Sequence, residues 1–147
     1  ETLAKVHERL PLTAGAICLL QKAKENGCHT ALVSGGFTLF AGPIATQLSF
    51  DTISANILEF ENNTLTGKVT GDIVDAESKL KTLKHLQNKL AINSSQIVAI
   101  GDGANDLLML SAAGTGIAFH AKPKVQEQAK TILNFNNLDA VRWFLNW

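Results

Sequence analysis

The 147-residue sequence contains only two cysteines, no excess charge of either sign and no long apolar run. Two cysteines cannot form a disulfide scaffold, and their scarcity favours a reducing compartment. Thirteen basic and thirteen acidic side chains give a formal net charge of +0, which argues against coating nucleic acid or an anionic membrane. No apolar run approaches the roughly 20 residues that cross a bilayer. With 46% hydrophobic residues, the chain has enough material for a globular core.

The printed sequence does not open with a charged segment followed by an apolar one, which is the pattern of a secretory signal. It begins at Glu1 rather than Met, so we expect either that a segment was removed or that this is part of a longer polypeptide. No repeat, low-complexity tract or linker divides the chain. Residues 1–147 are therefore predicted to form one domain.

Helical and strand-like stretches alternate along the chain, which is typical of an α/β sheet with crossover helices. β-Branched residues at 52–60 and 65–74 flank Asn62-Asn63 and predict a small β-hairpin. The other predicted strands are 29–33, 96–100, 116–119 and 131–134. The predicted helices are 2–9, 14–26, 37–48, 76–90, 107–113, 123–130 and 137–146.

A polar loop, Gly-Asp-Gly-Ala-Asn-Asp at 101–106, directly follows one predicted strand. Ligands of open α/β sheets bind at the carboxyl ends of the strands. Mg²⁺ takes one or two carboxylates together with phosphate oxygens and water, and Asp102 is placed to supply such a ligand. Asp106, one helical turn further on, could orient a metal-bound water or a lysine. The alternative is a helix N-cap, which accounts for one acidic residue but not for the cluster.

A second polar loop, Ser34-Gly35-Gly36, is predicted to follow the strand at 29–33. The Ser34 hydroxyl and the backbone N–H groups of the two glycines are expected at the N-terminus of a helix. Such a place suits an anion, because unpaired N–H groups and the positive end of the helix dipole face it. The alternative interpretation is a serine N-cap with glycines in a turn.

Lys79 lies in the first turn of the helix predicted from Ala76. A cation there opposes the helix dipole at a cost of a few tenths of a kcal/mol, roughly, which hints at a functional position. The alternative is a solvated lysine on a lysine-rich helix. A position on the helix surface predicts that Lys79→Ala lowers a reaction rate more than it lowers stability.

Taken together, Val-Ser-Gly-Gly-Phe (33–37), Lys79 and the loop at 101–106 resemble motifs two, three and four of the haloacid dehalogenase superfamily. Gly-Asp-Ile-Val-Asp-Ala (71–76) and His-Ala-Lys-Pro-Lys-Val (120–125) are similar to segments of the bacterial phosphoserine phosphatases in that superfamily. The resemblance covers essentially the whole chain and keeps the motif order. It implies a three-layer Rossmannoid α/β fold with a mostly parallel sheet and a small β-hairpin.

The resemblance implies hydrolysis of O-phosphoserine to serine and phosphate, which is the last step of serine biosynthesis. The family reaction depends on Mg²⁺, passes through an aspartyl-phosphate and takes place in the cytoplasm. A homodimer is among the assemblies that the resemblance allows, and it implies neither a nucleic-acid nor a membrane partner.

The resemblance also implies a role for each matching residue. Asp102 would bind the metal. Asp106 would hold a metal-bound water or Lys79, and Lys79 would neutralise charge on the phosphate and the nucleophile. The remaining roles concern the substrate: Ser34 and the Gly35 N–H would bind phosphate oxygens, and Asn105 would help to position the substrate.

The family's first motif, Asp-x-Asp-x-Thr, is missing from this sequence, and with it the nucleophile and the general acid. Most of the helical cap is missing too, and its final helix is expected within residues 1–10. In the superfamily, the strand with the first motif lies between the strand before Ser34 and the strand before Asp102. We therefore expect the C-terminal part of a longer enzyme, inactive alone, whose missing N-terminal segment fills the central place in the sheet.

Two other classes stay open at this point. One is a non-catalytic domain that binds phosphate or Mg²⁺, or an inactive fragment. The other is a different superfamily member, such as a sugar phosphatase or the phosphorylation domain of a cation pump. Pump domains share the loop at 101–106, but no transmembrane segment is present, and the Ser-Gly-Gly-Phe context favours the phosphoserine phosphatases.

Overall fold

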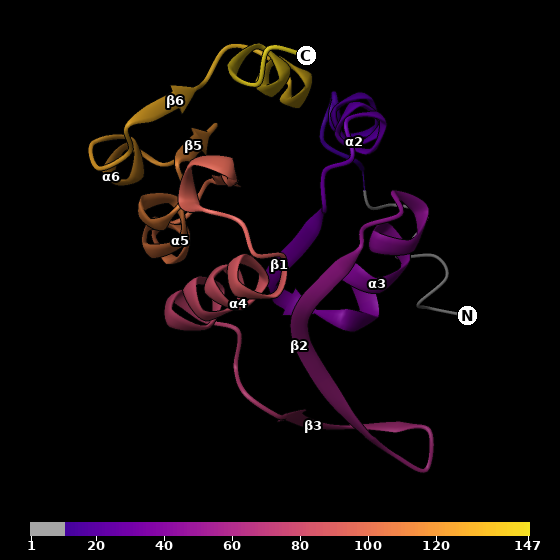
Figure 1. Ribbon diagram of the computed structural model, residues 1–147. Coiled ribbons are helices and arrows are strands. Elements are labelled where there is room, and N and C mark those ends of the chain that lie inside the picture. The colour runs from indigo at the N-terminus through magenta and orange to yellow at the C-terminus, as the bar shows by residue number, and fades with distance from the viewer. Residues whose placement is uncertain (1–10) are drawn as a thin grey trace. The chain divides into compact units, whose positions relative to one another are not determined.

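The computed structural model describes residues 11–147, which form two compact units, each with its own three-stranded sheet (Figure 1). The first unit comprises the described chain up to Asp72 together with Asn136–Trp147, and the second comprises Ile73–Phe135. The helix predicted at 2–9, and the cap segment expected within residues 1–10, lie outside the described residues. The assignment of residues 1–147 to a single domain stays a prediction.

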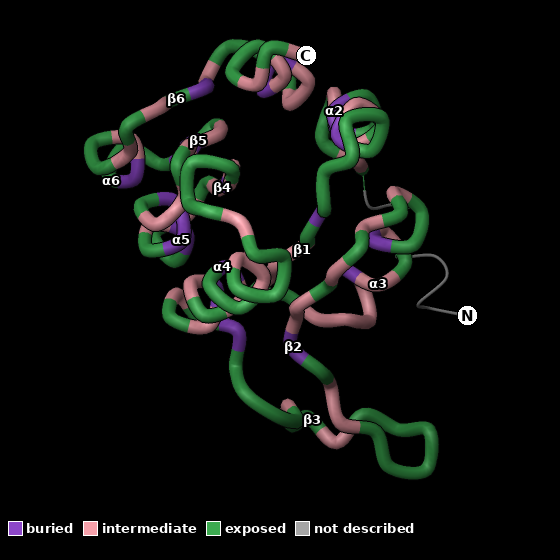
Figure 2. The backbone as a smooth tube through the Cα atoms, viewed as in Figure 1, coloured by how far each residue is buried: buried purple, intermediate pink, exposed green. Residues whose placement is uncertain are grey.

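The sheet of the first unit has the order β1-β2-β3. Its strands are β1 (Ala31–Phe37), β2 (Thr52–Glu61) and β3 (Thr64–Thr70). The first half of β2 pairs in parallel with β1, and its second half pairs antiparallel with β3. Asn62 and Asn63 join β2 to β3 with φ values of 50° and 62°, which is the left-handed backbone that a tight hairpin turn requires. The predicted hairpin is therefore confirmed, and its tip is exposed (Figure 2).

The described part of the first unit also contains three helical segments: α2 (Ala16–Glu25), α3 (Thr38–Gln47) and the 3₁₀ segment η3 (Leu138–Phe144). The buried residues of α2 are Ala16, Leu19 and Ala23, a spacing that forms one apolar stripe. The backbone N–H of Leu138 donates to the carbonyl of Ala14 at 2.9 Å, which ties η3 to the start of α2. The C-terminal helix predicted at 137–146 is thus a 3₁₀ segment rather than an α-helix.

The sheet of the second unit is parallel throughout and has the order β4-β5-β6. Its strands are β4 (Val98–Gly101), β5 (Thr115–Phe119) and β6 (Thr131–Leu133). Its helical segments are α4 (Ala76–Lys89), η1 (Ser94–Gln96), η2 (Ala104–Asp106), α5 (Leu107–Ala112) and α6 (Pro123–Gln126). The core of this unit consists of Leu83, Ala99, Met109, Leu110, Ala118, Ala121 and Val125.

The longest helix, α4, agrees with the prediction to within one residue and exposes Lys81, Lys84 and Lys89. The helix predicted at 123–130 is shorter and ends at Gln126. Only Val125 of this helix is buried, so packing stabilises no more than a single turn.

The predicted, mostly parallel sheet is present as two three-stranded parts. Among the described residues, β1 pairs only with β2 and β4 pairs only with β5, so each ends its own sheet. These are the two strands between which a nucleophile-bearing strand is expected, and that strand stays a prediction. No helix in residues 11–147 combines the length and the apolar character that crossing a membrane demands.

Candidate active site

A buried ion pair joins α4 to the loop after β4. The ammonium of Lys79 lies 2.6 Å from Oδ1 of Asp106, and the two residues are each only 5% exposed. Lys79 is therefore not a solvated surface lysine, and the surface interpretation is wrong. Its place in the first turn of α4 is defined by Asp75, whose carboxylate accepts a hydrogen bond from the Ser78 N–H at 2.8 Å. This hydrogen bond lowers the pKa of the Asp75 carboxyl.

The second carboxylate oxygen of Asp106 organises its own loop. Oδ2 accepts hydrogen bonds from the backbone N–H groups of Asp102, at 3.1 Å, and Gly103, at 2.9 Å. One carboxylate therefore holds a cation from α4 on one oxygen and the backbone of the loop on the other. Sequence spacing predicts that Asp106 could orient a lysine, and the structure contains that contact.

Gly101 is the residue that makes this arrangement sterically feasible. A Cβ atom at position 101 would lie 2.5 Å from both Cβ and Cγ of Asp106, closer than non-bonded carbon atoms approach. The last residue of β4 must therefore be glycine if Asp106 is to fold back over the strand end. The glycine at the end of this apolar strand thus allows a buried carboxylate to lie against the backbone.

Asp102 and Asn105 lie in the same loop, and both are exposed. No group of three or more His, Cys, Asp or Glu side chains within residues 11–147 could hold a metal ion. Mg²⁺ often takes only one or two protein carboxylates and completes its octahedral shell with water and phosphate oxygens. An exposed carboxylate at a strand end fits this mode of binding, with Asp102 as the protein ligand. The metal role of Asp102 and the substrate role of Asn105 stay predictions.

Ser34 and the two glycines after it belong to the first unit, where they lie inside β1 rather than in a loop. The helix α3 begins only at Thr38, and its N-cap, Phe37, makes no side-chain hydrogen bond. The predicted loop at a helix N-terminus and the serine N-cap alternative are therefore both wrong. Instead, the register between β1 and β2 shifts between Ser34 and Phe37, so the glycines form an irregularity within the strand.

A side chain that belongs to no recognised sequence motif forms a hydrogen bond with the irregular part of β1. The side-chain amide of Asn56, on β2, donates to the carbonyl oxygen of Gly35 at 2.8 Å. The signal that could reveal it is an asparagine in the middle of a predicted strand, where this residue type is depleted. The expected phosphate contacts of Ser34 and the Gly35 N–H stay predictions.

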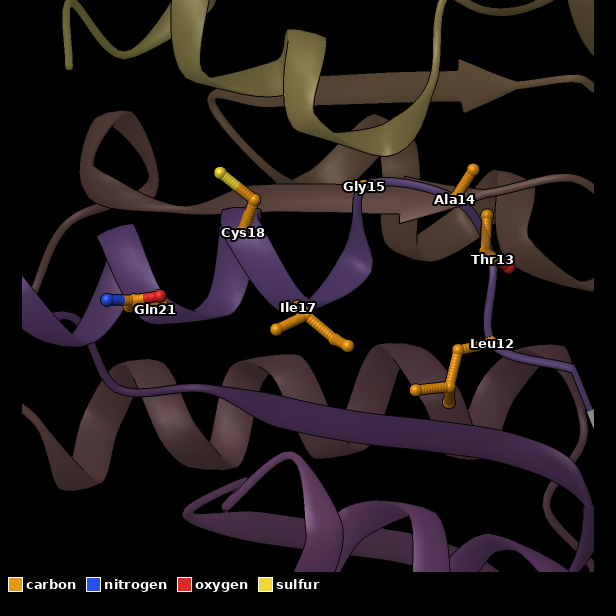
Figure 3. Close-up of a pocket in the computed structure, with 7 residues that line it drawn as sticks. All are labelled: Leu12, Thr13, Ala14, Gly15, Ile17, Cys18 and Gln21. Atoms are coloured by element: carbon orange, nitrogen blue, oxygen red, sulfur yellow. The ribbon is translucent and has the colours of Figure 1, made fainter. Parts of the chain in front are cut away.

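The first unit also contains a pocket of about 360 Å³ at the start of α2 (Figure 3). It is lined by Leu12, Thr13, Ala14, Gly15, Ile17, Cys18 and Gln21. None of these side chains is charged, so the pocket suits neither a phosphate group nor a metal ion. It includes none of the predicted site residues.

Comparison with known proteins gives a consistent result. A model of the haloacid dehalogenase-like hydrolase family matches residues 1–111. A phosphoserine phosphatase of Haemophilus influenzae is 47% identical over 144 residues, which are 98% of this chain and 46% of the relative. The chain thus spans about half the length of this curated relative.

Solved structures show the same likeness. The crystal structure of a probable phosphoserine phosphatase from Vibrio cholerae, in its unliganded form, matches with a TM-score of 0.93 and 40% identity. This match covers 97% of the present chain and 44% of the other. A substrate-bound phosphoserine phosphatase complex matches with a TM-score of 0.88 and 34% identity, over 95% of this chain and 67% of the other.

Proposed function

This chain belongs to the family of haloacid dehalogenase-like hydrolases, and on that premise we propose that its protein hydrolyses O-phosphoserine to serine and phosphate. The reaction would depend on Mg²⁺ and would complete serine biosynthesis in the cytoplasm. The similarity to phosphoserine phosphatases along 98% of the chain supports this substrate. Similarity to a substrate-bound phosphoserine phosphatase structure supports it as well.

The observation that carries the proposal is the buried Lys79–Asp106 pair with its hydrogen bonds to the loop of Asp102. A buried charge pair is weak evidence for stability alone, because desolvation offsets much of its attraction. A pair at the carboxyl end of a parallel strand instead suits the transfer of a phosphoryl group, which needs fixed charges around the phosphate oxygens. Lys79 would then neutralise negative charge on the phosphate, and Asp106 would keep its ammonium in place.

Asp102 would hold Mg²⁺ through its exposed carboxylate. The bound ion would supply positive charge to the phosphate oxygens. Ser34 and the Gly35 N–H would donate hydrogen bonds to phosphate oxygens, and Asn105 would help to orient the substrate. These groups bind and position the phosphate, and none of them is a nucleophile.

The nucleophile and the general acid are proposed to come from a segment outside the printed sequence, which contains no Asp-x-Asp-x-Thr. The described ends of the two sheets support this assignment, since β1 and β4 each pair on one side only among residues 11–147. A strand that carries the nucleophile could pair with either of them. The expected intermediate is an aspartyl-phosphate on that segment.

The function is tested by assaying the natural protein that contains this sequence against O-phosphoserine, phosphothreonine and sugar phosphates, with and without Mg²⁺. The proposal predicts Mg²⁺-dependent phosphate release with a clear preference for phosphoserine. Preference for a sugar phosphate would identify another phosphatase of the same family. Binding of phosphate without turnover of any substrate would identify a non-catalytic binding protein.

A further inference from the structure

Asn56 is one of four polar or charged residues that are buried within the described chain, and it is 7% exposed. It lies on β2, where its Nδ2 donates to the carbonyl oxygen of Gly35 at 2.8 Å. A buried amide of this kind must be hydrogen-bonded to be tolerated, and its partner here is the irregular part of β1 next to Ser34. The hydrogen bond therefore acts on the backbone that carries the expected phosphate-binding hydroxyl.

The hydrogen bond fixes the direction of one peptide group. No peptide bond among the described residues is cis, so the carbonyl of Gly35 and the N–H of Gly36 lie in one plane and point in opposite directions. With the carbonyl held by Asn56, the N–H of Gly36 is turned the other way. It donates to Oγ of Ser34 at 3.0 Å.

That second hydrogen bond determines what the Ser34 hydroxyl can do. A hydroxyl group has one proton to donate and two lone pairs to accept with. Because Oγ accepts from the Gly36 N–H, its proton remains for another acceptor. Ser34 is half-buried, and the two glycines after it are exposed. The Ser34 hydroxyl is thereby prepared to donate to an anion, and successive hydrogen bonds of this kind polarise one another.

We propose that Asn56 is a positioning residue that makes the Ser34 hydroxyl a donor to phosphate by orienting the Gly35–Gly36 peptide. The inference rests on the phosphate-binding part of the proposed function. Asn56 itself touches no substrate in this account. A purely structural Asn56 would instead affect stability without affecting phosphate affinity.

The test is a double-mutant cycle on phosphate affinity in the natural protein that contains this sequence. Inorganic phosphate is titrated calorimetrically in the presence of Mg²⁺ into the wild type, Ser34→Ala, Asn56→Ala and the double variant. Loss of a hydrogen bond to a charged group weakens binding by about 10- to 100-fold, and we expect this for Ser34→Ala. Asn56→Ala should produce most of the same loss, and the double variant should bind no more weakly than Ser34→Ala.

Thr30 provides the matched control. It is also 7% exposed and directly precedes Ala31, the first residue of β1, at the end of the strand away from Ser34. Its hydroxyl donates to Asp51 Oδ2 at 2.8 Å. Thr30→Ala should lower the free energy of unfolding and leave phosphate affinity unchanged. The comparison separates the loss of a buried hydrogen bond from the loss of orientation at Ser34.

The inference would be overturned by unchanged phosphate affinity in Asn56→Ala. It would also be overturned if the fold-losses of affinity of the two single variants multiply in the double variant. In either case, phosphoserine hydrolysis by the wild type would still support the proposed function. Asn56-dependent phosphate binding without phosphoserine hydrolysis would support the inference and overturn the function. No phosphate binding by the wild type would overturn both.

If Asn56→Ala does not fold, the wild type still provides a test by NMR. Phosphate should then shift the side-chain amide resonances of Asn56, although this residue does not touch the ligand. The amide resonances of Asn26, whose side chain donates to the carbonyl of Lys22, serve as the reference and should stay in place. Unshifted Asn56 resonances at saturating phosphate would contradict the inference.

Discussion

The ammonium of Lys79 and the carboxylate of Asp106 lie 2.6 Å apart, although 27 positions separate them in the sequence. A lysine in the first turn of a helix opposes the helix dipole, and here a buried carboxylate from the loop after β4 compensates it. The same carboxylate accepts two backbone N–H groups of the loop. The pair therefore couples the position of the cation to the conformation of the proposed metal-binding loop.

Replacing Lys79 should damage both stability and activity. Lys79→Met keeps much of the apolar stem but leaves Asp106 as a buried charge without its cation, which costs about 3–5 kcal/mol of unfolding free energy. The rate of phosphoserine hydrolysis should fall by about 100-fold or more, because fixed charge near the phosphate is lost. Denaturant unfolding and steady-state kinetics measure the two effects.

Lys84→Met is the matched control, because Lys84 is exposed on the same helix. It should change stability by no more than about 0.5 kcal/mol and leave the rate unchanged. Equal stability of Lys79→Met and Lys84→Met would contradict the importance of the buried pair.

Replacing Asp102 should separate function from stability. Asp102 is exposed, so Asp102→Asn should change the free energy of unfolding by no more than about 0.5 kcal/mol. The loss of one carboxylate charge should weaken the dependence of the hydrolysis rate on Mg²⁺ and lower kcat by about 100-fold or more. Asp72 is also exposed and lies outside the loop at 101–106, so Asp72→Asn is the matched control. It should change neither the free energy of unfolding nor kcat. Wild-type rates for Asp102→Asn at ordinary Mg²⁺ would refute the metal role.

Two glycine-to-alanine substitutions should change the free energy of unfolding in opposite directions. In Gly101→Ala the new methyl group would lie 2.5 Å from two Asp106 carbons, so we expect destabilisation by about 1–3 kcal/mol. Gly42 lies within α3, and a Cβ there meets nothing within 4 Å. Gly42→Ala should stabilise by about 0.4–1 kcal/mol, because alanine favours the helix. Thermal or denaturant unfolding checks both, and equal effects of the two changes would contradict the close approach at Gly101.

Stability should fall in acid partly through Asp51. The backbone N–H of Thr30 and then its hydroxyl hold the pKa of Asp51 below its ordinary value. A carboxylate whose pKa is lower in the folded state than in the unfolded state stabilises the folded protein when it is ionised. This contribution is complete above the pKa of the unfolded state, about 4, and disappears as the pH falls through the pKa of the folded state. Between about pH 7 and pH 3, the wild type should therefore lose more unfolding free energy than Asp51→Asn. Parallel pH profiles for the two proteins would show that this contribution is absent.

The elements with strong local signals are predictable from the sequence. The spacing of leucines predicts α4, and Asn62-Asn63 between two β-branched runs predicts the hairpin, because both patterns depend on residues close together in the chain. The burial of Lys79 is not predictable in this way. Its partner, Asp106, is remote in sequence, and the lysines around it at 81, 84 and 89 are exposed.

The start of α3 shows a different limit of sequence patterns. The glycines after Ser34 favour a turn locally, yet the pairing of β1 with β2 continues to Phe37 around an irregularity. Tertiary pairing therefore overrides the local preference. A sequence motif does not identify Asn56 for a similar reason. Its proposed role depends on which backbone carbonyl lies beside it on the neighbouring strand.

The proposed function requires Ser34, Lys79 and Asp102 each to contribute to the Mg²⁺-dependent hydrolysis of O-phosphoserine. The most direct measurement is phosphate release from O-phosphoserine across a Mg²⁺ titration, for the natural protein and for Ser34→Ala, Lys79→Met and Asp102→Asn. We expect Mg²⁺-dependent turnover in the wild type and a loss of about 10-fold or more in each variant. Turnover that needs no Mg²⁺, or that stays at the wild-type rate in any of the three variants, would contradict the proposed function.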